Sequence, residues 1–290
     1  DKCYAALREG TIDFVGGSAH SALSAFPEWN GVKLLCAQAQ GMYWFLVMRA
    51  DLNPQKGALD IVKGRNIGAA PWVNMGLQRL LINAGYDLER DQIKIAPVPG
   101  AAPGTGPVNF GLTAAKALED GKIDGFWANG MGTEVAVTRG VGKIVLDIRR
   151  GDGPKGCFNY TMASIAASDV LIDRHSEVAA AAVRRGDRIV ATHAIPEGAA
   201  PAAVRAIVAT QKALKADVTL ATQAGRALFP EQEAGLIAQI IQRDLPYYDA
   251  SITPDFVAGM NQFCREVGIL KGNPSFDNVV ATPFSKYWTA

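Results

Sequence analysis

The stretch AALREGTIDFVGGS (residues 5–18) is followed later in the chain by a related stretch, KALEDGKIDGFWAN (residues 116–129). Four identities share one offset of 111 residues, pairing Leu7 with Leu118, Gly10 with Gly121, Ile12 with Ile123 and Asp13 with Asp124. Each copy has the pattern of a helix end, a glycine that closes the helix, and a short apolar strand that stops at small residues. Small residues between a strand and a following helix are typical of the ligand crevice in α/β sheets. Because the offset is too long for a solenoid repeat, the duplication predicts two similar lobes that clamp a ligand.

The composition is that of an ordinary globular protein, with 290 residues, 49% hydrophobic and 20% charged. That length is enough to bury two medium-sized cores. A net charge of +1 gives no electrostatic signature for nucleic acid, so we expect no nucleic-acid partner. The cysteines are scattered, without a C-x-x-C pair or a nearby histidine at ligand spacing, which disfavours a metal or iron–sulfur site. They are Cys3, Cys36, Cys157 and Cys264, and the sequence does not decide whether any are paired. We expect no cofactor.

Apolar strands alternate with helical segments along the first half of the chain, which predicts an α/β fold with a mainly parallel sheet in each lobe and helices on both faces. Strands are expected at 11–15, 32–37, 66–70, 92–98, 123–127 and 143–148, and β-prone crossovers between the lobes at 43–49 and 158–164. Later helices are expected at 176–185, 201–214, 231–245 and 254–268, the last closed by Gly268, with an aromatic tail at 273–288. The predicted first lobe is discontinuous, 1–47 with 162–290, and the second lobe is 48–161.

The pattern A-L-x-x-G-x-I-D, a strand and then small residues resembles the type II periplasmic substrate-binding proteins of ABC importers. More narrowly, it resembles the branch that holds the nitrate-, sulfonate- and taurine-binding proteins and the thiamin-pyrimidine-precursor group. The end of the chain, TPDF (253–256) through FCREVGIL (263–270), is similar to the final helix of that branch and its glycine-hydrophobic stop. This resemblance covers essentially the whole chain.

The resemblance implies a two-lobed fold and capture of a small molecule for delivery to an ABC transporter permease, without chemistry. It further implies a monomer that is periplasmic or held outside the cytoplasm by a lipid anchor. Members of that branch have a strand and a helix, about 30 residues, ahead of the copy that here starts at Ala5. The resemblance therefore leads us to expect a first lobe that lacks this strand or covers its place with another segment.

Four loops are expected at strand ends and helix starts, where α/β clamps meet their ligands. They are Gly16–His20, Gln38–Gly41, Pro71–Asn74 and Trp127–Gly130. Helix starts carry unpaired N–H donors and partial positive charge, so they can hold a carboxylate, sulfonate or phosphate without arginine. Ser18 and Asn74 also fit simple helix caps. The predicted ligand-binding residues are Gly17, Ser18, His20, Gln40, Trp44, Trp72, Val73, Asn74, Trp127, Asn129, Gly130 and Tyr160.

The aromatic residues near these loops set the expected ligand class. Trp72 and Trp127 lie at strand ends and are predicted to stack on a ring of the ligand, whereas Trp44 fits a hinge or core position as well as a ligand contact. No lysine or arginine falls inside the four loops, which argues against a small hydrated dianion. A planar, aromatic or amphipathic organic molecule with at most one acidic group fits better.

Histidines and the glycine-rich segment have simpler interpretations. His20 fits a structural or surface role as well as a ligand contact, and His175 and His193 are expected at the surface. The segment 100–106 lacks the lysine and hydroxyl residue of a phosphate loop, so it is expected to be an insertion.

Two alternative functions stay open. An enzyme is one, since the thiamin-pyrimidine synthase and certain ring decarboxylases resemble this fold. The synthase's cysteine-rich cluster is missing here, and no nucleophile triad or carboxylate pair stands out. A sensory ligand-binding domain is the other, although no helix-turn-helix or basic stripe accompanies the pattern.

Overall fold

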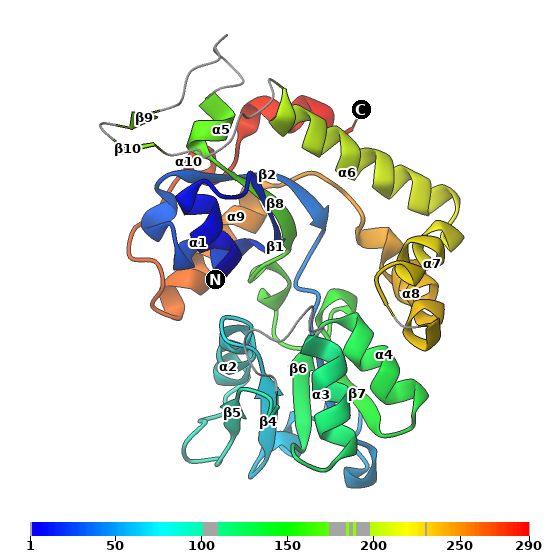
Figure 1. The fold of residues 1–290 in the computed structure, drawn as a ribbon. Coiled ribbons are helices and arrows are strands. Elements are labelled where there is room, and N and C mark those ends of the chain that lie inside the picture. Colours follow the sequence, from blue (N-terminus) through cyan, green and yellow to red (C-terminus); the bar gives the residue numbers. More distant parts are fainter. Residues whose placement is uncertain are drawn as a thin grey trace. The chain divides into compact units, whose positions relative to one another are not determined.

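The computed structural model describes residues 2–100, 110–173, 184–185, 188–189, 198–229 and 231–289. The chain forms two compact α/β units, each discontinuous in sequence (Figure 1). Unit 1 comprises Asp1–Gly41, Asn159–Ala216 and Leu245–Ala290, and unit 2 comprises Met42–Phe158 and Asp217–Asp244. The predicted two-lobed α/β class is confirmed. No helix in the described ranges is both long and apolar enough to cross a membrane.

Unit 1 contains a three-stranded sheet in the order β1 (Phe14–Ser18), β8 (Ala163–Ser168), β2 (Val32–Ala39). Both pairings are antiparallel, with Ser18 and Ala39 each opposite Ala163. The ends of β1 and β2 therefore lie at the same edge, on either side of the start of β8. This sheet differs from the mainly parallel one expected, because its middle strand, β8, runs against both neighbours. Strand β8 begins at Ala163, so it overlaps only the end of the crossover predicted at 158–164.

Helices pack around this sheet. They are α1 (Lys2–Glu9), η1 (Ala19–Ser24), η2 (Pro27–Trp29), α5 (Asp169–Asp173), α6 (Ala199–Ala216), η7 (Leu245–Tyr247), α9 (Pro254–Glu266), α10 (Phe276–Val279) and η8 (Thr282–Tyr287). Val204 and Val208 of α6 join the buried cluster of β2, and Gln211 donates from Nε2 to the Gln38 carbonyl at 2.9 Å. The expected helix ending at Gly268 is confirmed as α9, which Thr253 caps by accepting from the Phe256 N–H at 3.2 Å.

Some sequence predictions lie outside the described residues. These are the surface positions of His175 and His193 and almost all of the glycine-rich segment 100–106. Most of the predicted helix 176–185 is also outside them. Its last two residues form β9 (Arg184–Arg185), which pairs with β10 (Arg188–Ile189), rather than a helix.

Unit 2 contains a five-stranded sheet in the order β5 (Lys94–Ala96), β4 (Asn66–Ala69), β6 (Gly125–Ala128), β3 (Phe45–Arg49), β7 (Gly142–Asp147). Strand β4 is parallel to β5 and β6, whereas β3 is antiparallel to β6 and β7. Four strands thus run one way and end at the same edge, where β3 begins. The predicted crossover 43–49 is this reversed strand, so the sheet is mixed.

The helices of unit 2 are α2 (Asn74–Asn83), α3 (Phe110–Glu119), α4 (Gly130–Thr138), α7 (Thr219–Arg226) and α8 (Glu231–Asp244), with short turns η3 (Ala50–Leu52), η4 (Leu59–Val62) and η5 (Ile148–Arg150). The turn η6 (Cys157–Asn159) spans the boundary between the two units. Leu236, Ile237 and Ile240 of α8 pack against the core that α3, α4 and β6 form. The sequence analysis had placed residues 217–244 in the first lobe; their contacts place them in unit 2, because the apolar face of α8 completes that core.

The two repeat copies have the same local structure, one in each unit. Gly10 and Gly121 both take a left-handed conformation, with φ of 74° and 69°. The next residue bonds back in the same way in both copies: Thr11 N–H to the Ala6 carbonyl at 3.1 Å, and Lys122 N–H to the Ala117 carbonyl at 2.9 Å. This glycine-closed helix end directs the chain into β1 in unit 1 and into β6 in unit 2.

Candidate functional site

The carboxyl edge of unit 2 gathers two of the four predicted loops. We use this name for the residues after β4 (Ala70–Asn74), after β6 (Asn129–Gly130) and after β7 (Ile148–Arg150), with Tyr43 and Trp44 before β3. They meet because β4, β6 and β7 run in one direction and β3 runs in the other. The carboxyl ends of parallel strands are where α/β sheets bind their ligands.

The turn after β4 places Trp72 in an uncommon backbone conformation, with φ of 70°. The turn closes through the Asn74 N–H, which donates to the Ala70 carbonyl at 2.9 Å. Trp72, Val73 and Asn74 are all half-buried. Helix α2 begins at Asn74 itself, and Val73 occupies the cap position. Asn74 is therefore not the helix cap that the sequence also allowed.

Trp127 and Trp44 lie beneath this turn. Trp127 is fully buried and Trp44 is 2% exposed, and their rings meet edge to face at 6.0 Å. The Trp127 Nε1–H donates to the Val73 carbonyl at 3.1 Å. The expectation that Trp127 offers a face for stacking is therefore corrected, because both faces of its ring are enclosed in the core of unit 2. Trp44 takes the core role that the sequence had left open.

The start of α4 leaves donors without a side-chain cap. Asn129 holds the cap position in an extended conformation, but its side chain makes no capping bond. Its Oδ1 is buried without a hydrogen-bond partner among the described residues, while its carbonyl accepts from Thr133 Oγ1 at 3.1 Å. The first N–H groups of a helix carry partial positive charge. This end of α4 therefore suits an anion.

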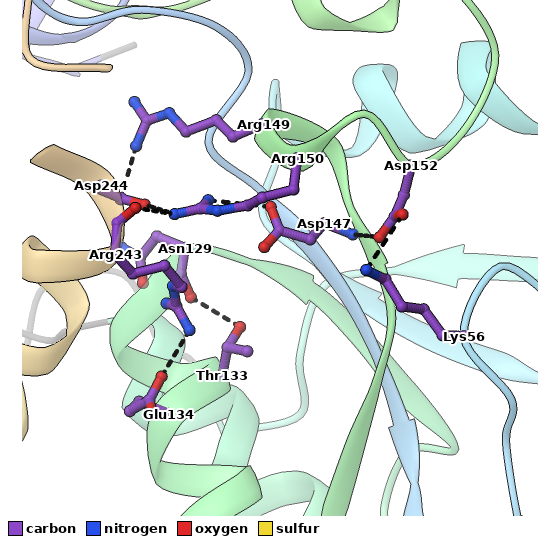
Figure 2. Close-up of polar contacts among 10 residues, drawn as sticks. All are labelled: Lys56, Asn129, Thr133, Glu134, Asp147, Arg149, Arg150, Asp152, Arg243 and Asp244. Carbon is purple, nitrogen blue, oxygen red and sulfur yellow. Dashed lines mark hydrogen bonds and ion pairs between the residues drawn. The ribbon is translucent and has the colours of Figure 1, made fainter. Parts of the chain in front are cut away.

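Arg243, at the end of α8, adds a full positive charge beside the start of α4 (Figure 2). Its Nη1 donates to Glu134 Oε2 at 2.9 Å, and its guanidinium lies over the Phe45 ring at 4.9 Å. Nε and Nη2 are buried with no partner in the part of the chain that the structure describes. A Cβ on Gly130 would lie 3.3 Å from Nη2, so this nitrogen approaches the first residue of α4.

A charge cluster fixes the neighbouring end of α8, as Figure 2 shows. Asp244 accepts from Arg149 Nη1 at 2.7 Å and also from Arg150 Nη2, and Arg150 Nη1 donates to Asp147 Oδ1 at 3.1 Å. Burial raises the pKa of Asp147, although the Arg150 guanidinium acts in the opposite direction. The Arg149 guanidinium lies 5.5 Å from the centre of the Tyr43 ring. This cluster ties η5 to the residue after Arg243 and so holds Arg243 in place.

Sequence reasoning missed this cluster. Its only local signals were the pairs Arg149-Arg150 after a strand and Arg243-Asp244 at a helix end. The two pairs are about 94 residues apart in the chain, and only the packing of α8 on unit 2 brings them together.

The carboxyl edge of unit 1 is the corresponding set of residues in the other sheet: Gly17 and Ser18 at the end of β1, Gln40 after β2, and Tyr160–Met162 before β8. A Cβ on Gly17 would meet no described heavy atom within 4 Å, so the backbone there is open. Ser18 is half-buried and its side chain makes no capping bond to η1.

His20 and Tyr160 belong to the core of unit 1. His20 is fully buried, and its Nδ1 lies 3.0 Å from Thr161 Oγ1. The Phe263 ring meets the His20 ring edge-on at 5.6 Å and stacks on Tyr160 at 4.5 Å. This packing gives both residues a structural role, the simpler of the two interpretations offered for His20.

Gln40 is also engaged within unit 1. Its Nε2 donates to the carbonyls of Asp249 at 2.9 Å and Ser251 at 2.6 Å, and its N–H donates to the Tyr247 carbonyl at 2.7 Å. Both hydrogens of the side-chain amide of Gln40 are thus bonded to the segment after η7. Gln40 therefore positions this loop and has no donor left for a ligand.

Unit 1 also has a surface hollow of about 510 Å³ beside η2. Glu28 in its wall accepts the N–H groups of Lys271 and Gly272 at 2.9 and 2.8 Å. These bonds lower the pKa of the Glu28 carboxyl. The asparagines around it, Asn30, Asn273 and Asn278, are exposed. Since the carboxylate is already satisfied and the walls are open, this hollow is a weaker candidate than the two carboxyl edges.

Two of the buried thiols, those of Cys36 and Cys264, are unsuited to nucleophilic chemistry. Burial raises the pKa of Cys36 to about 12 and also raises the pKa of Cys264. A thiol reacts as its thiolate, so both groups are unreactive at neutral pH.

No protein-family model matches the chain, and no curated protein matches it either. Solved structures do match. The chain is similar to the alkanesulfonate-binding protein SsuA from Xanthomonas axonopodis pv. citri bound to MOPS, with 14% identity and a TM-score of 0.61 over 98% of this chain and 83% of that one. It is similar to the periplasmic nitrate-binding protein NrtA from Synechocystis PCC 6803, with 11% identity and a TM-score of 0.62 over 98% and 76%.

An enzyme has the same architecture. The chain is similar to the desulfurization enzyme DSZB, with 13% identity and a TM-score of 0.53 over 97% of this chain and 86% of that one. At these identities the likenesses show the fold, and the function has to be argued from the site.

Proposed function

We propose that this protein is the solute-binding component of an ABC importer and that it captures a small organic anion with an aromatic or amphipathic body. The observation that carries the proposal is the placement of Arg243 beside the uncapped start of α4, at the same edge of unit 2 as Trp72. Two of the similar structures are an alkanesulfonate-binding and a nitrate-binding protein, and both of these ligands are anions.

The acidic group of the ligand would bind at the start of α4. Arg243 offers Nε and Nη2, which are buried and unmatched within the described ranges, and the first N–H groups of α4 add donors. A charged hydrogen bond of this kind is worth about 1.5–3 kcal/mol. Glu134, bonded to Nη1 of Arg243, balances part of the positive charge, so a singly charged carboxylate or sulfonate fits better than a dianion.

The body of the ligand would lie against Trp72, Asn74 and Tyr43. Trp72 is half-buried, unlike Trp127 and Trp44, and a partly exposed indole can stack on a ring or cover an apolar chain. From unit 1 we propose contacts with Gly17 and Ser18, whose edge is open. Gln40, His20 and Tyr160 would support these loops from within unit 1.

Delivery to a membrane partner completes the proposal. The ligand would be enclosed as the predicted two-lobe clamp closes, and an ABC permease would recognise the closed form. The protein would act outside the cytoplasm as a monomer. The narrower thiamin-pyrimidine-precursor branch stays a prediction from the sequence. The enzyme alternative is supported by the likeness to DSZB, but the raised pKa values of Cys36 and Cys264 give it no reactive thiol at those positions.

A ligand screen tests the proposal directly. Thermal shift and calorimetry would use p-toluenesulfonate, benzoate, MOPS and nitrate, with p-toluenesulfonamide as a neutral match for the first. We expect the organic anions to raise the melting temperature by mass action and the neutral analogue to leave it unchanged. Arg243→Gln should weaken p-toluenesulfonate binding about tenfold or more, the worth of a charged hydrogen bond.

The control is Arg226→Gln, since Arg226 is an exposed arginine of the same unit that forms an ion pair with Glu231 at 3.6 Å. It should bind as the wild type does. Binding of the sulfonamide as tightly as the sulfonate would contradict the anion proposal. If the protein converted any of these ligands to a product, the enzyme alternative would replace the transport proposal.

A further inference from the structure

Trp72 has a backbone conformation that a tryptophan does not adopt without support. Its φ is 70°, in the left-handed region that is unfavourable for any residue with a Cβ. Glycine would satisfy that conformation without strain, yet the turn reads Pro71-Trp72-Val73-Asn74. Strain of this kind persists only where the surroundings hold it, and it gathers at functional positions.

One support is a hydrogen bond from the core. Trp127 sits in β6 opposite Ala69, the last residue of β4, so the sheet fixes its ring directly below the turn. Its Nε1–H donates to the Val73 carbonyl at 3.1 Å. Because the ring is fully buried, loss of this bond would leave the carbonyl or the N–H unsatisfied.

A second support is the close packing of the first turn of α2. A Cβ on Gly76 would lie 2.9 Å from Trp44 Cζ3 and 3.3 Å from Met42 Sδ. The helix therefore rests directly on Trp44, which in turn packs edge-on against Trp127. The turn is held at Val73 by a hydrogen bond and at Gly76 by contact, and the half-buried Trp72 directly precedes Val73.

We infer that Trp127 is a positioning residue, whose indole N–H fixes the Val73 carbonyl and thereby holds the left-handed turn that presents Trp72 to the ligand. This inference rests on the proposed function for the ligand, but the state of the turn can be measured without one.

The first arm of the test removes the N–H and keeps a large ring. Trp127→Phe should lower the affinity for p-toluenesulfonate about five- to tenfold, the effect of one buried hydrogen bond. The matched control is Trp29→Phe, since Trp29 is also buried, at 3% exposed, and its Nε1 has no partner among the described residues. That variant should bind as the wild type does.

The second arm separates positioning from general stability. Trp72→Gly accepts a positive φ and removes the ring, so it should weaken binding by itself. Within the Trp72→Gly background, Trp127→Phe should change affinity less than twofold, because no ring remains to be positioned. Equal losses in both backgrounds would mean that Trp127 acts on stability alone and would overturn the inference.

The third arm needs no ligand. Hydrogen exchange of the backbone amides of residues 72–76 should be faster in Trp127→Phe than in the wild type and unchanged in Trp29→Phe. Unchanged exchange in Trp127→Phe would overturn the inference, whatever the affinities. If the wild type binds no anion of the screen, the proposed function fails, and the exchange rates still decide whether Trp127 holds the turn.

Discussion

Asp147, the last residue of β7, makes the stability of unit 2 depend on pH. It is 6% exposed, and burial raises the pKa of its carboxyl in spite of the hydrogen bond from Arg150. A carboxyl with a raised native pKa binds its proton more tightly in the folded protein than in the unfolded chain. Its contribution to stability is thus fully present below the unfolded pKa and is lost as pH rises through the higher native value.

Asp147→Asn removes this titration and keeps an oxygen that can accept from Arg150. The wild type should therefore lose stability relative to Asp147→Asn as pH rises from about 3 to about 7. Urea denaturation of both proteins across that pH range measures the difference between their free energies of unfolding. The other titrating groups contribute almost equally to both proteins, so their effects largely cancel in this difference. A difference that grows in favour of the wild type toward neutral pH would show that the native pKa is lowered instead.

Single residues also show where sequence reasoning stops. Trp72 and Trp127 both follow apolar strands and looked equivalent, yet Trp127 is enclosed and Trp72 is not. The difference arises because Trp127 is still within the register of β6 opposite Ala69, whereas Trp72 lies beyond the end of β4. Arg243 could not be placed at all, since its position depends on a helix packing onto a distant part of the chain.

The crossing of α3 and α4 depends on two glycines. A Cβ on Gly132 would lie 2.2 Å from the Gly111 carbonyl oxygen, so the two backbones touch near the start of α4. We expect Gly132→Ala to destabilise the protein by about 1–3 kcal/mol, the usual cost of overpacking, and to weaken p-toluenesulfonate binding because it displaces the start of α4.

The matched change is Gly235→Ala on α8, where a Cβ would meet no described heavy atom within 4 Å. Alanine is the better helix former there and should stabilise the protein by about 0.5–1 kcal/mol. Urea denaturation measures both variants. Equal effects of the same sign would mean that helix propensity, and not the close approach of α3 to α4, decides the outcome at Gly132.

The positions of helices and strands were predicted better than the directions in which the strands run. Local chemistry determines the helix ends at Gly10 and Gly121 and the capped helix α9, and these were predicted from the sequence. The segments 43–49 and 158–164 were predicted as β-prone crossovers. Strand β3 lies within the first and β8 begins at the end of the second, and both strands run against their neighbours in the sheets. Apolar patterns report that a strand is buried; they carry no information about the direction in which it pairs.

At the scale of the whole molecule, the chain passes four times between the two units, after residues 41, 158, 216 and 244. The unit boundaries cannot be read from composition, because α8 looks like any amphipathic helix until its partner is known. Its apolar residues cover the core of unit 2, and its last residue, Asp244, binds Arg149 and Arg150. The core of unit 2 is therefore incomplete without residues 217–244, which are separated from residue 158 by about 60 residues of the chain.

This architecture predicts how unit 2 behaves in isolation. Residues 42–158 alone should lack a cooperative thermal transition and should bind a hydrophobic dye, because the core under α8 is uncovered and Arg149 loses its buried partner. An unpaired buried charge costs about 3–5 kcal/mol, a large part of the stability of a domain. Joining residues 217–244 to them through a long Gly-Ser linker should restore a cooperative transition, followed by circular dichroism.

Two variants of the joined protein make the comparison specific. Ile237→Asp should abolish the restored cooperative transition, since Ile237 is partly buried against the core of unit 2 and a carboxylate there would lose part of its hydration without gaining a partner. Leu228→Asp, at a residue 77% exposed in the same segment, should leave the transition in place. A cooperative transition at the same temperature in residues 42–158 alone would mean that α8 adds nothing to the fold of unit 2. In that case Arg243 would have no fixed position at the start of α4, and the anion site would need another source of positive charge.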